Sequence, residues 1–138
     1  MLQYVTAELL SLLEQQNIEK GEVFLGSGLT ESDLTSVSML SAIQSDQLSS
    51  QALKLSSDIA LGLKLGVKLN MLSLGILGYA LMSCATVEKA LYLLRRYNQA
   101  VAPSLTIDIV THGSSASLVG SGIHLPSHLE RFYTDTLF

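Results

Sequence analysis

The chain has 138 residues, of which 48% are hydrophobic and 14% are charged. This length fits one domain with one core, and a composition so rich in apolar residues excludes an intrinsically disordered protein. Its 8 Lys and Arg residues against 12 Asp and Glu residues give a net charge of −4. The charge argues against DNA binding by this chain alone, because nucleic-acid surfaces neutralise several phosphates with a basic patch.

The first expected element is an amphipathic helix that ends near Asn17. Its apolar residues follow helical spacing: Leu2, Val5, Leu9, Leu12 and Leu13. Glycines at positions 21, 26 and 28 then break the period. Thr30 and Asp33, three residues apart, resemble a capping box and predict a short helix or turn.

The next segment, residues 35–50, is rich in Ser and weakly patterned, and it predicts a loop with a short helix. Helical spacing resumes with Leu48, Ala52 and Leu55, and Asp58 is placed to cap the following helix. A DNA-reading helix-turn-helix in this part of the chain is rejected, because its second helix would be apolar apart from two lysines.

Residues 59–102 are apolar and helix-like, with glycines at positions 62, 66, 75 and 78. Glycine costs a helix about 1 kcal/mol relative to Ala, so four of them predict close packing between helices, or helix ends. In the last helix Thr86 is the expected N-cap and Glu88 suits the first turn. Its apolar stripe comprises Val87, Ala90, Leu91 and Leu94, and Pro103 is expected to end it.

After Pro103 the period changes from helical to alternating. Leu105, Ile107 and Ile109 alternate along one segment, residues 112–115 supply a turn, and Ala116, Leu118 and Gly120 alternate along the next. This pattern predicts an antiparallel β-hairpin.

Pro126 is expected at the first position of a final helix with four apolar residues: Leu129, Phe132, Tyr133 and Leu137. The order of elements predicts an α+β fold, in which an N-terminal helical part is followed by an antiparallel β-hairpin and a C-terminal helix. We expect a single domain over residues 1–138.

The cysteine content and the N-terminus indicate the compartment. Cys84 is the single cysteine, and residues 1–22 lack the basic region of a secretory signal, so we expect a cytoplasmic protein. Residues 69–85 are 17 uncharged residues in a row. This run includes Asn70 and lies at the lower edge of spanning length, which favours a buried helix over a membrane span.

The common catalytic and nucleotide-binding motifs are missing from the sequence, and we predict no catalytic residue and no cofactor. The histidines are His112, His124 and His128. The last two are four residues apart, as metal ligands on a helix are, but Pro126 lies between them and no Cys or carboxylate nearby completes a ligand set. We therefore predict no metal site.

Four short sequence pieces occur in order between Leu61 and Tyr97: LGLKLG at residues 61–66, LGILGYALMS at 74–83, TVEKAL at 86–91 and RY at 96–97. Together they resemble the N-terminal effector domain of AraC-type bacterial transcriptional regulators, in the branch with an arabinose-binding-type domain. The similar pattern there is a GLxxG helix, an LGxxGYA segment, a turn with a small residue and Thr, and an ALxxxxRY helix.

The chain departs from this pattern in small ways at the turn and in a larger way at its end. Ala85 stands where the family commonly has Pro, and Cys84 where it often has Ser. The family's sensing domain extends past the position that matches Phe138, and a basic DNA-binding domain with two helix-turn-helix units follows it. We therefore expect a truncated sensing domain without the DNA-binding domain.

The resemblance implies a domain that binds an unidentified small effector, forms a homodimer and controls DNA binding by the separate C-terminal domain. It does not imply arabinose as the effector, and it transfers no ligand residues. Tyr79, Arg95, Arg96 and Tyr97 are the candidate ligand-binding residues, because Arg can hold a carboxylate through two hydrogen bonds. The alternative role of these residues is helix packing and complementation of the helix dipole.

Two other hypotheses remain open. One is a pure dimerisation module without a ligand, which an exposed apolar tail would favour; that tail comprises Phe132, Tyr133, Leu137 and Phe138. The other is a small thiol enzyme that uses Cys84, since the helix start at Thr86 would lower a thiol pKa. An inert, partly buried thiol is the alternative for Cys84.

Overall fold

The computed structural model describes residues 3–30, 32–33, 40–102, 104–113, 115–122 and 125–137. The elements in chain order are α1 (Gln3–Glu14), α2 (Lys20–Ser27), α4 (Ala42–Leu55), α5 (Leu61–Lys68), the 3-10 helix η1 (Met71–Leu74), α6 (Ile76–Met82), α7 (Val87–Val101), β1 (Leu105–His112), β2 (Ser115–Gly122) and α8 (Ser127–Leu137). The predicted α+β fold, with a hairpin and then a C-terminal helix, is confirmed.

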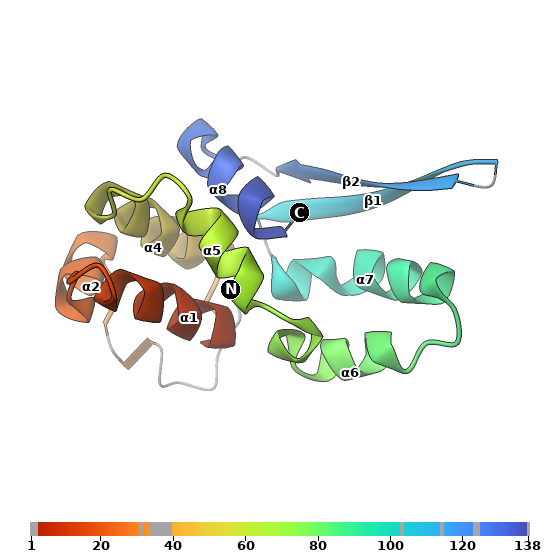
Figure 1. Ribbon diagram of the computed structural model, residues 1–138, viewed down its shortest axis with the longest axis horizontal. Coiled ribbons are helices and arrows are strands. Elements are labelled where there is room, and N and C mark those ends of the chain that lie inside the picture. The colour runs from red at the N-terminus through yellow and green to blue at the C-terminus, as the bar shows by residue number, and fades with distance from the viewer. Residues whose placement is uncertain are drawn as a thin grey trace.

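The elements gather in two parts that Figure 1 shows side by side. Helices α1, α2, α4 and α5 pack together with α8, and we call these five helices the body. The second part, which we call the arm, comprises η1, α6, α7, β1 and β2, and it extends away from the body (Figure 1).

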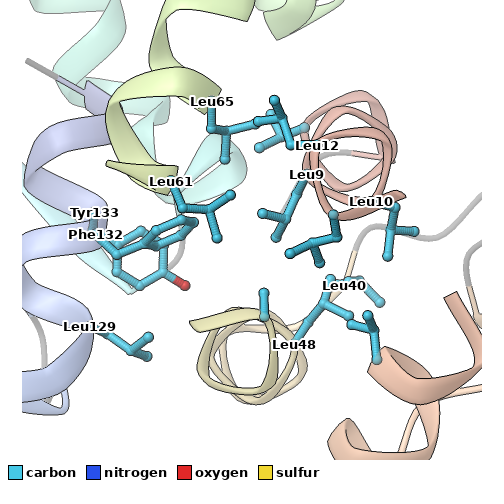
Figure 2. Packing of buried hydrophobic residues seen from close by; sticks show 14 of the residues in the cluster. Leu9, Leu10, Leu12, Leu40, Leu48, Leu61, Leu65, Leu129, Phe132 and Tyr133 are labelled. Carbon is cyan, nitrogen blue, oxygen red and sulfur yellow. The ribbon is translucent and has the colours of Figure 1, made fainter. Parts of the chain in front are cut away.

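The core lies inside the body, where apolar side chains from α1, α4, α5 and α8 point toward one another (Figure 2). Leu9, Leu48, Leu61, Leu65 and Leu129 are each 0% exposed. The predicted apolar stripe of α1 is confirmed over its described members, since Val5, Leu9, Leu12 and Leu13 are all buried; Leu2 lies outside the described residues. The helix ends at Glu14, and a turn continues to Asn17, which has a positive φ of 62°.

Glycines in α5 allow this helix to lie directly against the backbone of α8. A Cβ atom on Gly62 would lie 2.6 Å from the carbonyl oxygen of Phe132, and one on Gly66 would lie 2.8 Å from the carbonyl oxygen of Thr136. Thr136 also donates a hydrogen bond to the carbonyl oxygen of Gly62. The predicted close packing at these glycines is confirmed.

Helix α4 begins earlier than its weak apolar pattern predicts. Ser41 and Gln44 form a full capping box, with the Gln44 N–H donating to Ser41 Oγ at 3.2 Å and the Ser41 N–H donating to Gln44 Oε1 at 3.0 Å. Ser45 and Ser49 are buried, and such small side chains let neighbouring elements approach. The prediction of a loop with a short helix over residues 35–50 is right that a helix occurs here and wrong in separating it from the next one, because residues 42–50 form a single helix with residues 51–55; residues 35–39 lie outside the described residues.

The predicted contacts at helix starts are present in part. The Asp33 carboxylate accepts the N–H of Thr30 at 2.7 Å. The N-cap position of α5 is Ala60, and no side chain caps this helix, so the predicted Asp58 cap is wrong; the Asp58 carboxylate instead accepts the N–H of Ala60 itself at 3.0 Å. Thr86 caps α7 by accepting the N–H of Lys89 at 3.2 Å. The Thr86 contact satisfies one of the N–H groups that the first turn of a helix leaves without a partner.

In the arm, α6 packs against η1, and α7 packs against β1. A Cβ atom on Gly78 would overlap the carbonyl oxygen of Met71, so this glycine is required by close packing, as predicted. The buried helix predicted for residues 69–85 is wrong, because the run contains two short helices, η1 and α6, and exposes Ile76 and Met82 among other apolar residues. Within the described part of the chain, no helix is both long and apolar enough to cross a membrane.

Strands β1 and β2 pair antiparallel from Leu105 opposite Gly122 to His112 opposite Ser115. Gly113 has a positive φ of 60° in the connecting turn, which confirms the predicted hairpin. Pro103 and Ser114 lie outside the described residues. The final helix starts at Ser127, one residue later than predicted, and Pro126 precedes it.

The predicted exposed tail is wrong for its aromatic residues. Phe132 is 3% exposed and Tyr133 is 8% exposed, and both belong to the core. Leu137 is 39% exposed, and Phe138 lies outside the described residues. The aromatic residues are buried because α8 packs between α5 and α4 through this face.

Candidate functional site

The four residues predicted to bind a ligand lie in the arm. Tyr79 is on α6 and is 62% exposed. On α7, Arg95 Nε lies 3.1 Å from Asp108 Oδ1 of β1, and the Arg96 guanidinium lies 5.7 Å from the centre of the Tyr97 ring. None of the four lines any of the hollows described below. Their role in ligand binding stays a prediction.

The other candidate residues are also separate from one another. Cys84 lies two residues after the end of α6, and its Sγ donates to the carbonyl oxygen of Ala80 in that helix at 3.3 Å. His128 Nε2 lies 2.8 Å from Ser50 Oγ, and His112 lies at the end of β1; His124 lies outside the described residues. Within the described ranges, no group of three or more His, Cys, Asp or Glu side chains could hold a metal ion.

A polar network that sequence reasoning missed connects α4, α8 and the segment before β1. Asp46 Oδ1 accepts two hydrogen bonds of 2.8 Å, one from the Tyr133 hydroxyl and one from the Ser104 hydroxyl. Ser49 Oγ lies 3.4 Å from the same Tyr133 oxygen. Three segments that are 58 and 87 residues apart in sequence therefore meet at one carboxylate.

The electrostatics of the network fix the protonation of Tyr133. Burial, together with the hydrogen bond to Asp46, raises the pKa of the Tyr133 hydroxyl well above its usual range. The hydroxyl is therefore protonated at neutral pH, and it donates a hydrogen bond to the Asp46 carboxylate. This arrangement orients Asp46, because two donors hold one of its oxygens.

One side of the network faces a small apolar cavity of about 50 Å³ that Leu65, Leu105 and Phe132 help to line. A space of this size holds one or two water molecules at most. It is too small for a metabolite, so we do not assign a ligand to it.

The other side of Asp46 faces a groove between α2 and α4, with a volume of about 600 Å³. This lies within the usual range for small-molecule sites. One wall consists of residues 25–28, and the other consists of Ile43, Asp46, Gln47, Ser50, Gln51 and Lys54, with Pro126 at the rim. These α4 residues are spaced three or four apart, so they share one face of the helix.

Glycines shape the α2 wall of this groove. The Gln51 side chain lies where a Cβ atom on Gly26 would be, so the absence of a side chain on Gly26 lets Gln51 lie against α2. Gly28 ends α2 in the left-handed conformation with a φ of 71°. Gly26 thus lets the two walls approach, and Gly28 turns the chain at the end of α2.

A hollow of about 380 Å³ beside α5 and α8 contains charges that already have partners. There Asp58 Oδ2 lies 2.6 Å from Lys64 Nζ, and Arg131 Nε lies 3.3 Å from Asp135 Oδ2. A further hollow of about 280 Å³ lies between the hairpin and α8. The groove between α2 and α4 is the better candidate site, because it combines suitable volume with an oriented carboxylate.

Comparison with known proteins identifies relatives of the chain. Residues 18–138 match the family described as the arabinose-binding domain of AraC transcription regulators, N-terminal. The chain is also 31% identical over 111 residues to the "Ornithine utilization regulator" of Pseudomonas aeruginosa. That alignment covers 80% of this chain and 33% of the relative, so the chain spans about a third of the length of the curated relative.

Proposed function

The chain belongs to the family of N-terminal arabinose-binding domains of AraC transcription regulators, and from this premise we propose that it senses a small effector and controls DNA binding by a separate C-terminal domain. The observation that carries the proposal is the groove of about 600 Å³ whose wall contains Asp46. The family is one of regulators, and we propose that the domain works in the cytoplasm without catalysing a reaction.

The hydrogen bonds of Asp46 supply a route from the groove to the rest of the molecule. Asp46 contacts Tyr133 of α8 and Ser104, which immediately precedes β1. A ligand that moves Asp46 would therefore disturb both C-terminal elements. Such a ligand regulates only if it binds two conformations with different affinity.

A thermal-shift panel tests the sensing proposal. It should include L-ornithine, since the relative is named for ornithine utilisation, as well as L-arabinose and common amino acids, sugars and organic acids. We expect one compound to raise the melting temperature, because a ligand at 100 times its Kd stabilises the folded state by about 2.7 kcal/mol. A panel that leaves the melting temperature unchanged throughout would contradict the sensing role.

Control of DNA binding needs the longer protein. We expect the effector found in the panel to change the affinity of the whole regulator for its promoter in a gel-shift titration. If the bound effector left the affinity for the promoter unchanged, the domain would bind a ligand without controlling DNA binding.

A second function, homodimerisation without a ligand, is favoured by exposed apolar residues in the arm. Ile76 is 89% exposed, Val87 is 76% exposed, and Tyr79 and Met82 are each 62% exposed. Exposed apolar residues on neighbouring helices are typical of contact surfaces. Sedimentation equilibrium tests this function, and a monomer at high concentration would contradict it.

A further inference from the structure

We propose that the groove between α2 and α4 binds a small aliphatic amino acid with an ammonium group on its side chain, held between Asp46 and Lys54. The inference rests on the proposed sensing function and names the chemical class of the effector. It follows from the charges in the groove, their spacing and the apolar residues beside them.

The first observation is that Asp46 has no cationic partner within the described part of the chain. Both of its hydrogen bonds come from neutral hydroxyls and end on Oδ1, which leaves Oδ2 for another donor. The side chain is partly buried. A partly buried, oriented carboxylate attracts a cation more strongly than a solvated one does, because less solvent competes.

The second observation is a charge of opposite sign at the other end of the same wall. Lys54 is exposed and forms no ion pair among the described residues. It lies eight residues after Asp46 on one helix, a rise of about 12 Å. The flexible lysine side chain shortens this gap, so a ligand of a few bonds can reach both charges.

The third observation concerns the space between the two charges. Gln47 and Gln51 line it with amide groups that can donate and accept hydrogen bonds. Leu25 and Ile43 also line the groove and are 88% and 71% exposed, so an aliphatic chain would cover them. A phosphorylated ligand would be repelled by Asp46, and a neutral sugar would leave both charges unpaired.

Three probes separate the contributions of the two charges. L-ornithine carries both groups, L-norvaline has the same carbon chain without the side-chain ammonium, and 1,4-diaminobutane lacks the carboxylate. By isothermal titration of the 138-residue chain, we expect L-ornithine to bind at least about 10-fold more tightly than either analogue, since each lost contact is a charge-assisted hydrogen bond. Equal affinity of all three would overturn the proposal.

Two variants locate these contacts. D46N keeps an oxygen for the Tyr133 hydroxyl but removes the charge, and it should weaken L-ornithine about 10-fold while leaving L-norvaline unchanged. K54Q should weaken L-ornithine while leaving 1,4-diaminobutane unchanged, and its exposed position keeps the test valid if D46N does not fold. E22Q and K89Q make the same charge changes outside the groove and should bind L-ornithine as the unmodified chain does.

Backbone amide chemical shifts add a direct view of the site. L-ornithine should shift the amides of Gly26, Ser50 and Gln51 and leave those of the β-hairpin turn in place. If both D46N and K54Q bound L-ornithine with unchanged affinity, the groove between α2 and α4 would not be its binding site, while the proposed sensing function would stand. If a compound other than a side-chain ammonium amino acid were the one that raised the melting temperature, the proposed ligand class would likewise be wrong and the sensing function would stand. If no compound raised the melting temperature, both proposals would be wrong.

Discussion

The body and the arm differ in how their elements pack and in how many apolar side chains they bury. In the body, α5 packs on α8, α2 packs on α4, and α1 packs on α5, so each helix has a neighbour for its apolar face. In the arm, α7 packs on β1, α6 packs on η1 and α7, and the two strands pair with each other. The elements of the arm thus contact mainly one another.

Burial shows what this difference means for stability. The body contains nearly all of the buried apolar cluster, whereas Leu81, Leu105 and Ile107 are the buried apolar residues of the arm within the described ranges. Both parts expose apolar side chains, but the arm has few buried ones to set against a long exposed series: Met71, Leu72, Ile76, Tyr79, Met82, Val87, Tyr92, Tyr97, Val110 and Val119. The body therefore has its own core, and we expect the arm to open locally at lower free energy.

The largest effect should come from deleting a core side chain of the body. Leu48→Ala removes a side chain that is 0% exposed and belongs to the core cluster shown in Figure 2. We expect it to lower the free energy of unfolding by about 3 kcal/mol, from lost burial and the cavity left behind. Urea denaturation followed by circular dichroism measures this change.

The matched variant in the arm is Ile76→Ala, at a residue that is 89% exposed. It should change the free energy of unfolding by less than about 0.5 kcal/mol, because no buried contact is lost. A loss comparable to that of Leu48→Ala would show that the exposed face of α6 is covered in solution and would remove the distinction between the two parts.

Glycine substitutions test close packing in each part. Gly66→Ala places a Cβ atom against backbone oxygens of α8, which cannot move aside, and we expect a loss of about 2 kcal/mol in global stability. Gly78→Ala meets the backbone of η1 in a similar way, but inside the arm. Its effect should appear as faster amide hydrogen exchange in η1 and α6, with a smaller change in the urea midpoint.

Gly21→Ala is the control for this pair, because a Cβ atom there meets nothing within 4 Å. In α2 it should be neutral or stabilise by about 0.5 kcal/mol through higher helix propensity. Destabilisation by Gly21→Ala, or a neutral Gly66→Ala, would contradict the packing described for these glycines.

The hydrogen bonds of Asp46 join the two parts, because this carboxylate of the body accepts from Tyr133, also in the body, and from Ser104, the residue before the hairpin. Tyr133→Phe removes one donor to this carboxylate and should cost about 1.5 kcal/mol. Tyr79→Phe, at an exposed hydroxyl, is the control and should have no measurable effect.

The pH dependence gives a second measure of the same contact. Because the folded-state pKa of Tyr133 is raised, its contribution to stability is fully present below the ordinary tyrosine pKa of about 10 and is lost as the pH rises above that value. The unmodified chain should therefore lose stability above pH ~10 more steeply than Tyr133→Phe does. Parallel profiles of the two proteins would contradict the burial of the hydroxyl.

Local signals in the sequence predicted much of the fold. The stripe of α1, the Thr86 cap and the hairpin all follow from residues that are near one another in the chain. The start of α4 was missed although Ser41 and Gln44 carry the spacing of a capping box, because the Ser-rich apolar pattern after them is weak. The local signal for this helix start is therefore the pair Ser41 and Gln44 and not the apolar pattern.

The candidate site could not be predicted in the same way. Asp46 contacts Tyr133 and Ser104 only because α4, α8 and the segment before β1 pack together. The spacing of apolar residues along one helix or strand does not predict such a contact. The groove likewise depends on Gly26 and Gln51, which come from different helices. The predicted ligand residues Arg95, Arg96 and Tyr97 rest on the chemistry of a polar cluster along one helix, and that helix, α7, packs against β1 in the arm and does not border the groove.

The smallest effect, and the finest test of the comparison, comes from two helix caps of similar chemistry. Ser41 caps α4 in the body, and Thr86 caps α7 in the arm, each by accepting a backbone N–H at 3.2 Å. Ser41→Ala and Thr86→Ala should each cost about 1 kcal/mol where the helix is formed. Since α4 contributes to the core, Ser41→Ala should lower the urea midpoint of the whole chain, whereas Thr86→Ala should mainly raise amide exchange in the first turn of α7. An equal fall in the midpoint for both variants would mean that the arm unfolds together with the body.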